Sequence, residues 1–171
     1  MKKPLLNLNE VELTPRPAAF EPEADTRMPY GLSMGQLASE LGARRLGYNI
    51  TAVPSGCAAF PRHNHHVNEE MFLILEGEGE LQVGDDVWPV KPMDIIACPP
   101  GGPETAHQIR NTGEIELRFL AVSTRMSPEY VEYPDSGKFG VFADRVGGEG
   151  KRPRLSYLGR EENSLDYWDG E

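Results

Sequence analysis

The chain has 171 residues, a length that fits one domain with a single hydrophobic core. Its formal net charge of −10 argues against a nucleic-acid partner, because proteins that bind a phosphate backbone present a basic surface. The 18 glycines and 15 prolines favour short strands joined by many turns over a helical bundle.

The sequence shows no sign of a membrane or secretory segment. No apolar run approaches the roughly 20 residues that span a bilayer, and residues 1–10 lack the apolar region of a secretory signal. We therefore expect a cytoplasmic protein without a membrane partner. Cys57 and Cys98 form no Cys-x-x-Cys pair, and their apolar or small neighbours predict buried free thiols, as suits a reducing compartment.

Residues 1–43 are predicted to form an N-terminal arm that ends in a short helical turn. Five prolines, from Pro4 to Pro29, disfavour a regular element in the arm. Apolar residues then recur at helical spacing over Ser33–Leu41, and Gly42 follows as a stop. The pattern predicts one or two helical turns there.

Residues 44–125 are predicted to form a β-barrel core. Apolar residues alternate along residues 44–53, and again over residues 115–121, which is typical of half-buried strands. Residues 71–75 are apolar on both faces, as expected of a strand covered on both sides. Strands at intervals of about 8–12 residues, separated by glycine- and proline-rich turns, predict an all-β barrel or sandwich of the jelly-roll kind.

Residues 126–171 are predicted to form a C-terminal extension that packs on the barrel or on a partner subunit. The segment from Gly147 to Arg154 is glycine-rich and basic, and the acidic end after it carries Tyr157, Tyr167 and Trp168. An unstructured tail seldom keeps such aromatic side chains exposed. With the apolar outer face of the strand over residues 70–75, the two long ends predict a homodimer, which sedimentation would test.

Three of the four histidines lie in one polar turn just before residues 70–75, and the fourth, His107, follows a second turn. His63 and His65 are two positions apart, so on a strand they would point the same way. A carboxylate a few residues on could join them from the next strand, which is how a metal site is built from a sheet. The alternative is a solvated loop whose imidazoles bind nothing; the strand beside the cluster favours the metal site.

These two stretches resemble the two motifs of the cupin superfamily. The first motif here reads Gly56, six residues, His63-Asn64-His65, four residues, Glu70, six residues and Gly77. The second reads Pro99-Pro100-Gly101, five residues, His107, three residues and Asn111. It departs from the superfamily pattern in two ways: Met93 stands in place of a leading glycine, and the interval from Gly101 to His107 is five residues instead of two.

The resemblance implies a double-stranded β-helix, the jelly-roll barrel of the cupins, with one bound metal ion. The ligands it implies are His63, His65, Glu70 and His107. Glu69 is set aside because Glu70 keeps the six-residue interval to Gly77, and His66 is set aside because its parity differs from that of His63. Three imidazoles and one carboxylate suit a divalent transition metal, Mn, Fe, Ni or Zn, whose identity the ligand set leaves open.

The resemblance implies a metal-dependent enzyme that acts on a small polar or anionic metabolite. Dioxygenase chemistry and sugar-phosphate isomerase or epimerase chemistry are the leading subclasses. The alternative is a non-catalytic module that binds a small ligand or a sugar, because the same scaffold serves many functions. Whether the protein is an enzyme thus stays open.

No catalytic residue is assigned from the sequence. An acid or base is normally needed beside the metal, and Tyr48 is a candidate if its face lines the barrel; a packed aromatic is the other interpretation. Four cationic side chains could meet an anionic substrate: Arg62, Arg110, Arg118 and Lys138. The parity of Arg110 and Arg118 places these two on the outer face.

Overall fold

The computed structural model describes residues 4–17, 21–22, 26, 28–144 and 154–171. The helical segments are η1 (Leu8–Glu10), α1 (Ala38–Leu41), η3 (Pro103–Thr105) and η4 (Glu161–Asn163). The strands are β1 (Thr14–Pro15), β2 (Ser33–Gln36), β3 (Leu46–Val53), β4 (Asn64–His65), β5 (Glu70–Glu76), β6 (Gly79–Val83), β7 (Asp86–Val90), β8 (Ile95–Cys98), β9 (His107–Arg110), β10 (Leu117–Thr124), β11 (Glu129–Tyr133), β12 (Lys138–Asp144) and β13 (Arg154–Gly159). The predicted glycine-rich segment from Gly147 to Arg154 falls almost entirely outside the described residues.

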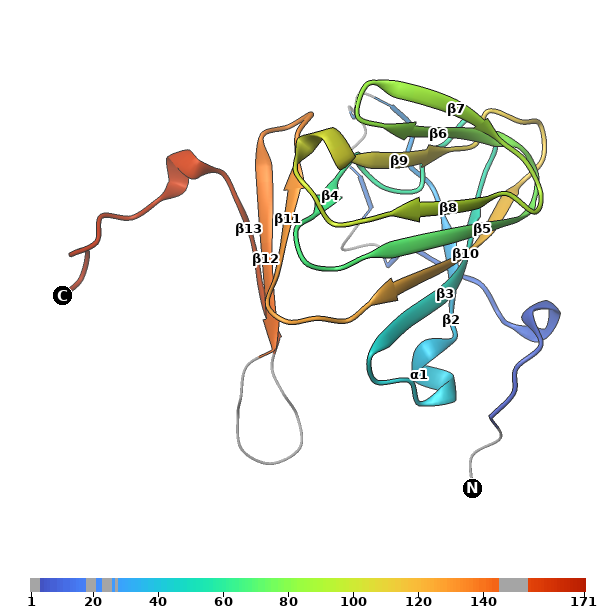
Figure 1. Ribbon diagram of the computed structural model, residues 1–171, viewed down its shortest axis with the longest axis horizontal. Coiled ribbons are helices and arrows are strands. Elements are labelled where there is room, and N and C mark those ends of the chain that lie inside the picture. The colour runs from blue at the N-terminus through green and yellow to red at the C-terminus, as the bar shows by residue number, and fades with distance from the viewer. Residues whose placement is uncertain (1–3, 18–20, 23–25, 27, 145–153) are drawn as a thin grey trace.

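Within the described ranges the strands form three antiparallel sheets. Their orders are β1-β2-β3-β10-β5-β8, β13-β12-β11-β4 and β7-β6-β9. Figure 1 shows β7, β6 and β9 stacked over β8, β5 and β10, with β11 to β13 closing one side. The protein is therefore an all-β jelly-roll barrel, as predicted from the turn-rich composition.

The barrel core lies between the stacked sheets. Phe72 and Ile74 of β5 point inward beside Phe119 of β10, and the rings of Phe72 and Phe119 meet edge to face at 5.7 Å. Burying each such side chain stabilises the fold by about 1.5–3 kcal/mol. Glu70 shares the inward face of β5 because side chains alternate along a strand, so the packing that stabilises the barrel also directs this carboxylate inward.

The prediction of helical turns over Ser33–Leu41 is wrong for its first half. Ser33–Gln36 forms strand β2, which pairs with β3 from Ser33 opposite Ala52 to Gln36 opposite Asn49. Only Ala38–Leu41 is helical, and Gly42 ends it in the left-handed conformation with φ +77°. The free edge of β3 offers hydrogen bonds to the chain, and this pairing outweighs the local helical spacing.

Two positions explain the turn chemistry of the motifs. Gly77 has φ +79°, and a Cβ there would lie 2.5 Å from the Glu116 carbonyl oxygen, so only glycine fits. Met93 keeps the left-handed conformation, with φ +75°, although it carries a side chain. Such a residue costs about 1–2 kcal/mol, and the Met93 side chain lies in solvent, 76% exposed.

The C-terminal segment continues beyond the barrel. Strand β13 pairs with β12, and the ring of Tyr157 lies 5.9 Å from that of Phe139. After β13 the chain extends away from the body (Figure 1), and Tyr167 and Trp168 are 84% and 72% exposed. The homodimer stays a prediction.

No helix in the described part of the chain has both the length and the apolar character needed to cross a membrane.

Candidate metal centre

Three strands bring the predicted ligands together at one end of the barrel. His65 lies in β4, Glu70 begins β5 and His107 begins β9. His63 precedes β4 and is held to His107 by two backbone hydrogen bonds: the His63 N–H donates to the His107 carbonyl at 3.1 Å, and the His107 N–H donates to the His63 carbonyl at 2.8 Å. Residues 44 positions apart in the chain thus become direct neighbours.

The three imidazoles surround one carboxylate oxygen. Oε2 of Glu70 lies 3.1 Å from Nε2 of His107, 3.4 Å from Nε2 of His65 and 3.9 Å from Nε2 of His63. The group His63, Glu70 and His107 offers ligand atoms that all lie within 4.8 Å of one another. Ligand atoms about 2.1 Å from one ion would be about 3.0 Å apart at right angles and about 4.2 Å apart when opposite. The three separations from Oε2 of Glu70 fall in this range, whereas the wider spacings in the group would have to close slightly around an ion, and His65 lies outside the group.

The second nitrogen of each imidazole faces an oxygen acceptor. Nδ1 of His63 lies 2.8 Å from the Pro61 carbonyl, and Nδ1 of His107 lies 3.3 Å from the Thr105 carbonyl. Nδ1 of His65 lies 3.3 Å from Oε2 of Glu129, close enough for a charge interaction, but the two atoms do not form a hydrogen bond. Because carbonyl oxygens only accept, the neutral rings of His63 and His107 carry their proton on Nδ1 and their lone pair on Nε2. In that state two imidazole lone pairs and the Glu70 carboxylate face one another, an arrangement that a shared metal ion would stabilise.

The ionisation of the cluster follows from burial and mutual charge. Burial, with the nearby His107, lowers the pKa of His63 to about 4. Burial would also lower the pKa of His65, but its contacts with Glu70 and Glu129 outweigh burial and raise it above the ordinary value. Burial likewise opposes the charge of Glu70, yet the Nε2 groups of His107 and His65, which donate hydrogen bonds to Glu70 when these nitrogens carry a proton, hold the pKa of this carboxyl well below its usual range. The site therefore keeps Glu70 ionised.

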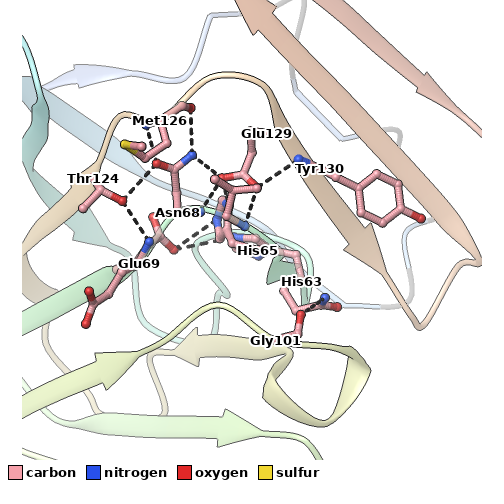
Figure 2. Close-up of polar contacts among 12 residues, drawn as sticks. His63, His65, Asn68, Glu69, Gly101, Thr124, Met126, Glu129 and Tyr130 are labelled. Carbon is pink, nitrogen blue, oxygen red and sulfur yellow. Dashed lines mark hydrogen bonds and ion pairs between the residues drawn. The ribbon is translucent and has the colours of Figure 1, made fainter.

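Glu129 of β11 lies beside Nδ1 of His65, on the side of the ring opposite Glu70. The sequence pattern did not predict this residue. This carboxylate is 4% exposed and accepts hydrogen bonds from the backbone N–H groups of Asn68 at 2.9 Å and Tyr130 at 2.9 Å, and from the side-chain amide of Asn68. Figure 2 shows Asn68 between Glu129 on one side and Thr124 and Met126 on the other, both of which hydrogen-bond to the Asn68 side chain. A carboxylate behind a metal-binding imidazole fixes the ring's tautomer and orientation.

The two residues set aside as ligands lie away from the cluster. Nε2 of His66 lies 2.7 Å from Oε2 of Glu132, and the His66 ring lies 4.7 Å from that of Tyr130. Glu69 is exposed, and its backbone N–H donates to the Thr124 hydroxyl at 3.0 Å. Asn64, between the two histidines, points the other way and donates to the Gly101 carbonyl at 2.9 Å.

A cavity of about 560 Å³ opens over the cluster and would admit a small metabolite. His63, His65 and Glu70 line it, together with the phenol of Tyr133. The Tyr133 ring stacks on that of His63 at 6.0 Å, and burial raises the pKa of Tyr133, so its hydroxyl stays protonated at neutral pH. Two exposed cations, Arg44 and Arg125, also line this cavity.

The other candidate residues take different places. Tyr48 pairs with Val122 in the sheet and is not among the described residues that line this cavity. Arg118 lies near Glu116 and Glu76 at the surface, with nitrogen–oxygen separations of 3.4 and 3.8 Å. Arg62 and Lys138 line a second cavity, which also borders Tyr133. The acid–base candidate at the site is thus Tyr133, not Tyr48.

Comparison with known proteins identifies the barrel. The sequence pattern of the family described as Cupin domain matches residues 49–123. The uncharacterized protein MJ1618 of Methanocaldococcus jannaschii is 38% identical over 61 residues, which make up 36% of this chain and 46% of the relative, so the match spans about half the length of that relative.

Solved structures extend the similarity in fold to nearly the whole chain. A candidate sugar phosphate isomerase from Acidithiobacillus ferrooxidans is 24% identical with a TM-score of 0.75, covering 96% of each chain. A sugar phosphate isomerase from Silicibacter pomeroyi is 24% identical with a TM-score of 0.75, covering 97% of this chain and 98% of the other. A predicted oxalate decarboxylase from Thermotoga maritima is 25% identical with a TM-score of 0.55, covering 71% and 99%.

Proposed function

Because this chain belongs to the cupin superfamily, we propose that it is a metal-dependent enzyme acting on a small polar or anionic metabolite. One observation carries the proposal: the ligand atoms of His63, Glu70 and His107 lie within 4.8 Å of one another, and Nε2 of His65 lies 3.4 Å from the same Glu70 oxygen. We propose that the ligands are His63, His65, Glu70 and His107. The ion is one of the divalent transition metals that prefer such a mixed set, Mn, Fe, Ni or Zn.

The chain's own residues would prepare the site for a small anion. Four protein ligands leave two positions of a six-coordinate ion for water or substrate, and an ion with open positions can polarise a carbonyl or activate water. Glu129 holds His65 in orientation, and Arg44 and Arg125 add positive charge to the cavity lining. The Tyr133 hydroxyl, kept protonated by burial, can donate a hydrogen bond or a proton to a bound oxygen atom.

Among the activities compatible with this site, isomerisation or epimerisation of a sugar phosphate is the one we put first. Two proteins with the same fold over nearly the whole chain are described as a sugar phosphate isomerase or a candidate one. A bound divalent ion, together with Arg44 and Arg125, would outweigh the lining carboxylates Glu70, Glu129 and Asp144 and attract an anionic substrate. A carbonyl polarised beside a proton donor suits this chemistry. Dioxygenase chemistry on a small acid is the other subclass that the same ligand set supports.

The proposal predicts an exchangeable water and a proton-transfer activity. Protein loaded with Mn²⁺ should enhance water-proton relaxation, and a 2-hydroxy acid or a sugar phosphate should reduce that enhancement by displacing water. The same protein should exchange the proton next to the carbonyl of a sugar phosphate with deuterium, followed by ¹H NMR in D₂O, while the His107→Ala variant should not. Water displacement without proton exchange or other turnover would favour the non-catalytic binding module instead.

Metal binding should weaken in two stages as the pH falls. Imidazoles bind metal only when neutral, and His65, whose pKa lies above 6.5, takes up its competing proton first. Apparent affinity should therefore begin to fall above pH 6.5, by about tenfold per pH unit for one competing proton. His63, with a pKa of about 4, should steepen the loss only near pH 4. Metal titrations between pH 8 and pH 4 measure this, and constant affinity down to pH 4.5 would contradict it.

A further inference from the structure

A second cavity, of about 570 Å³, concentrates positive charge in an acidic protein. It is lined by the side chains of Arg16, Arg62, Lys138 and Arg160 and by Tyr133, and we call it the basic cavity. The chain has 17 lysines and arginines against 27 acidic residues, yet four of those cations meet here with Asp135 as the one acidic member of the described lining. A cluster of positive charges in a protein with a net negative charge needs a physical explanation.

Mutual repulsion makes this arrangement costly unless an anion offsets it. Arg62 is neutralised, because its Nη2 and Nε lie 2.6 and 3.0 Å from Oδ1 of Asp135. Among the residues that the structure describes, Arg16, Lys138 and Arg160 form no ion pair within 4.0 Å. Burial lowers the pKa of Arg16, and the fields of Glu21 and Tyr30 only partly oppose it. Three cations therefore have charge left to share with a ligand.

The same side chains keep hydrogen-bond donors available. A guanidinium has five N–H donors. Nη2 of Arg16 donates to the Ala59 carbonyl, with its guanidinium 5.5 Å from the Phe60 ring, and Nε of Arg160 donates to the Ser136 carbonyl at 3.3 Å. Nζ of Lys138 lies 5.5 Å from the centre of the Tyr133 ring. These contacts hold the side chains in place and leave most of their donors unused, which favours an acceptor with several oxygen atoms.

A neighbouring cavity of about 450 Å³ is less favourable for an anion than the basic cavity. It shares Tyr133, Lys138 and Arg160, but three carboxylates also line it: Glu132, Glu161 and Glu162. Those three carboxylates outnumber the two cations on that side and would repel an anion. In the basic cavity, Arg16 adds a further positive charge to those of Lys138 and Arg160.

We propose that the basic cavity binds a phosphate group, carried by a small ligand, between Arg16, Lys138 and Arg160. A phosphate dianion carries the negative charge that would neutralise these cations and enough acceptor oxygens for their unused N–H groups. Arginine also recognises phosphate through paired N–H groups. The site is separate from the metal ligands. Among the described lining residues, Tyr133 alone belongs to both cavities, and its ring stacks on His63, so it forms part of the wall between them.

Inorganic phosphate, titrated into the full-length protein by calorimetry at neutral pH, tests the proposal. Phosphate should bind, and the Arg160→Gln and Lys138→Gln variants should each lose about tenfold in affinity or more, as expected for one charge-assisted contact. The matched control is Arg118→Gln, which removes the same charge from a surface position near Glu116 and Glu76. That control should bind phosphate within about twofold of the wild type.

The titration is repeated after the metal has been removed with a chelator, because phosphate can also bind a metal ion directly. Affinity that survives chelation supports the basic cavity. Absence of binding by the wild type, binding that requires metal, or an equal loss in Arg118→Gln would each overturn it. Circular dichroism and thermal unfolding check that Arg160→Gln and Lys138→Gln remain folded, and because these residues lie on β12 and beyond β13, failure of one variant to fold leaves the other as the test.

A second titration identifies the source of the phosphate group. Glycerol phosphate, a simple phosphate monoester, is compared with inorganic phosphate in the same wild-type protein. Tighter binding of the monoester would show that the cavity takes a phosphorylated metabolite, whereas tighter binding of inorganic phosphate would show a site for the free ion. Either order supports the site if the Arg160→Gln variant weakens both, and an unchanged affinity of the variant for both overturns it.

Discussion

Protein in which His63 is replaced by alanine should lose its metal, with affinity reduced by more than about a hundredfold. Removing a residue that only hydrogen-bonds to a metal ligand costs about 10–100-fold in metal affinity. His63→Ala removes a ligand atom itself, so its effect should be larger. Nε2 of His63 lies 3.9 Å from Oε2 of Glu70, and its tautomer is set by the Pro61 carbonyl. Elemental analysis of protein purified without added metal, followed by a metal titration, gives both occupancy and affinity.

His66→Ala is the matched control for this loss. It removes an imidazole from the same turn, but one that pairs with Glu132 instead of Glu70, so its metal content should equal that of the wild type. The His65→Ala variant tests whether His65 is the fourth ligand. If it is, the metal affinity of His65→Ala should fall as far as the metal affinity of His63→Ala. Equal metal content in the wild type and in folded His63→Ala would contradict the assignment of His63 as a ligand.

Replacing Asn111 with alanine should destabilise the barrel by about 3–5 kcal/mol. Asn111 is 0% exposed, and its side-chain amide donates to the carbonyls of Val53 at 2.7 Å and Ile115 at 2.8 Å and accepts from the Gly113 N–H at 2.9 Å. Each buried group left without a partner costs about 1–3 kcal/mol. Because folded proteins are stable by only about 5–15 kcal/mol, urea unfolding should show a large shift of the midpoint.

Asn163→Ala provides the comparison for Asn111. Asn163 is exposed in η4, where its side chain accepts from the Arg160 N–H at 3.3 Å, so its loss should cost less than about 1 kcal/mol, as for other exposed caps. Folded Asn111→Ala should still bind metal, since its hydrogen-bond partners, Val53, Gly113 and Ile115, are not among the proposed ligands. A free energy of unfolding for Asn111→Ala within about 1 kcal/mol of the wild type would refute the proposed role.

Much of the barrel could be predicted because its strands obey a local rule. Alternation of apolar residues located β3 and β10, and the two-residue interval placed His63 and His65 on one side of the chain while excluding His66. These inferences succeed because the direction of a side chain on a strand depends only on its parity. Where two local signals competed, as in Ser33–Leu41, pairing with β3 decided the outcome, and that pairing is not visible in the local spacing.

The sequence by itself determined the all-β class, the turns that need glycine and the pattern of histidines and glutamate that predicts a metal site. Only the tertiary structure decided what surrounds that pattern. Glu129 lies 64 positions from His65 in the chain, and Tyr133 lies 70 positions from His63, yet both meet these histidines in the folded protein. The basic cavity likewise draws Arg16 and Arg160 from opposite ends of the chain. Such contacts depend on which strands pair and how the sheets stack, and these are properties of the whole fold instead of any one segment.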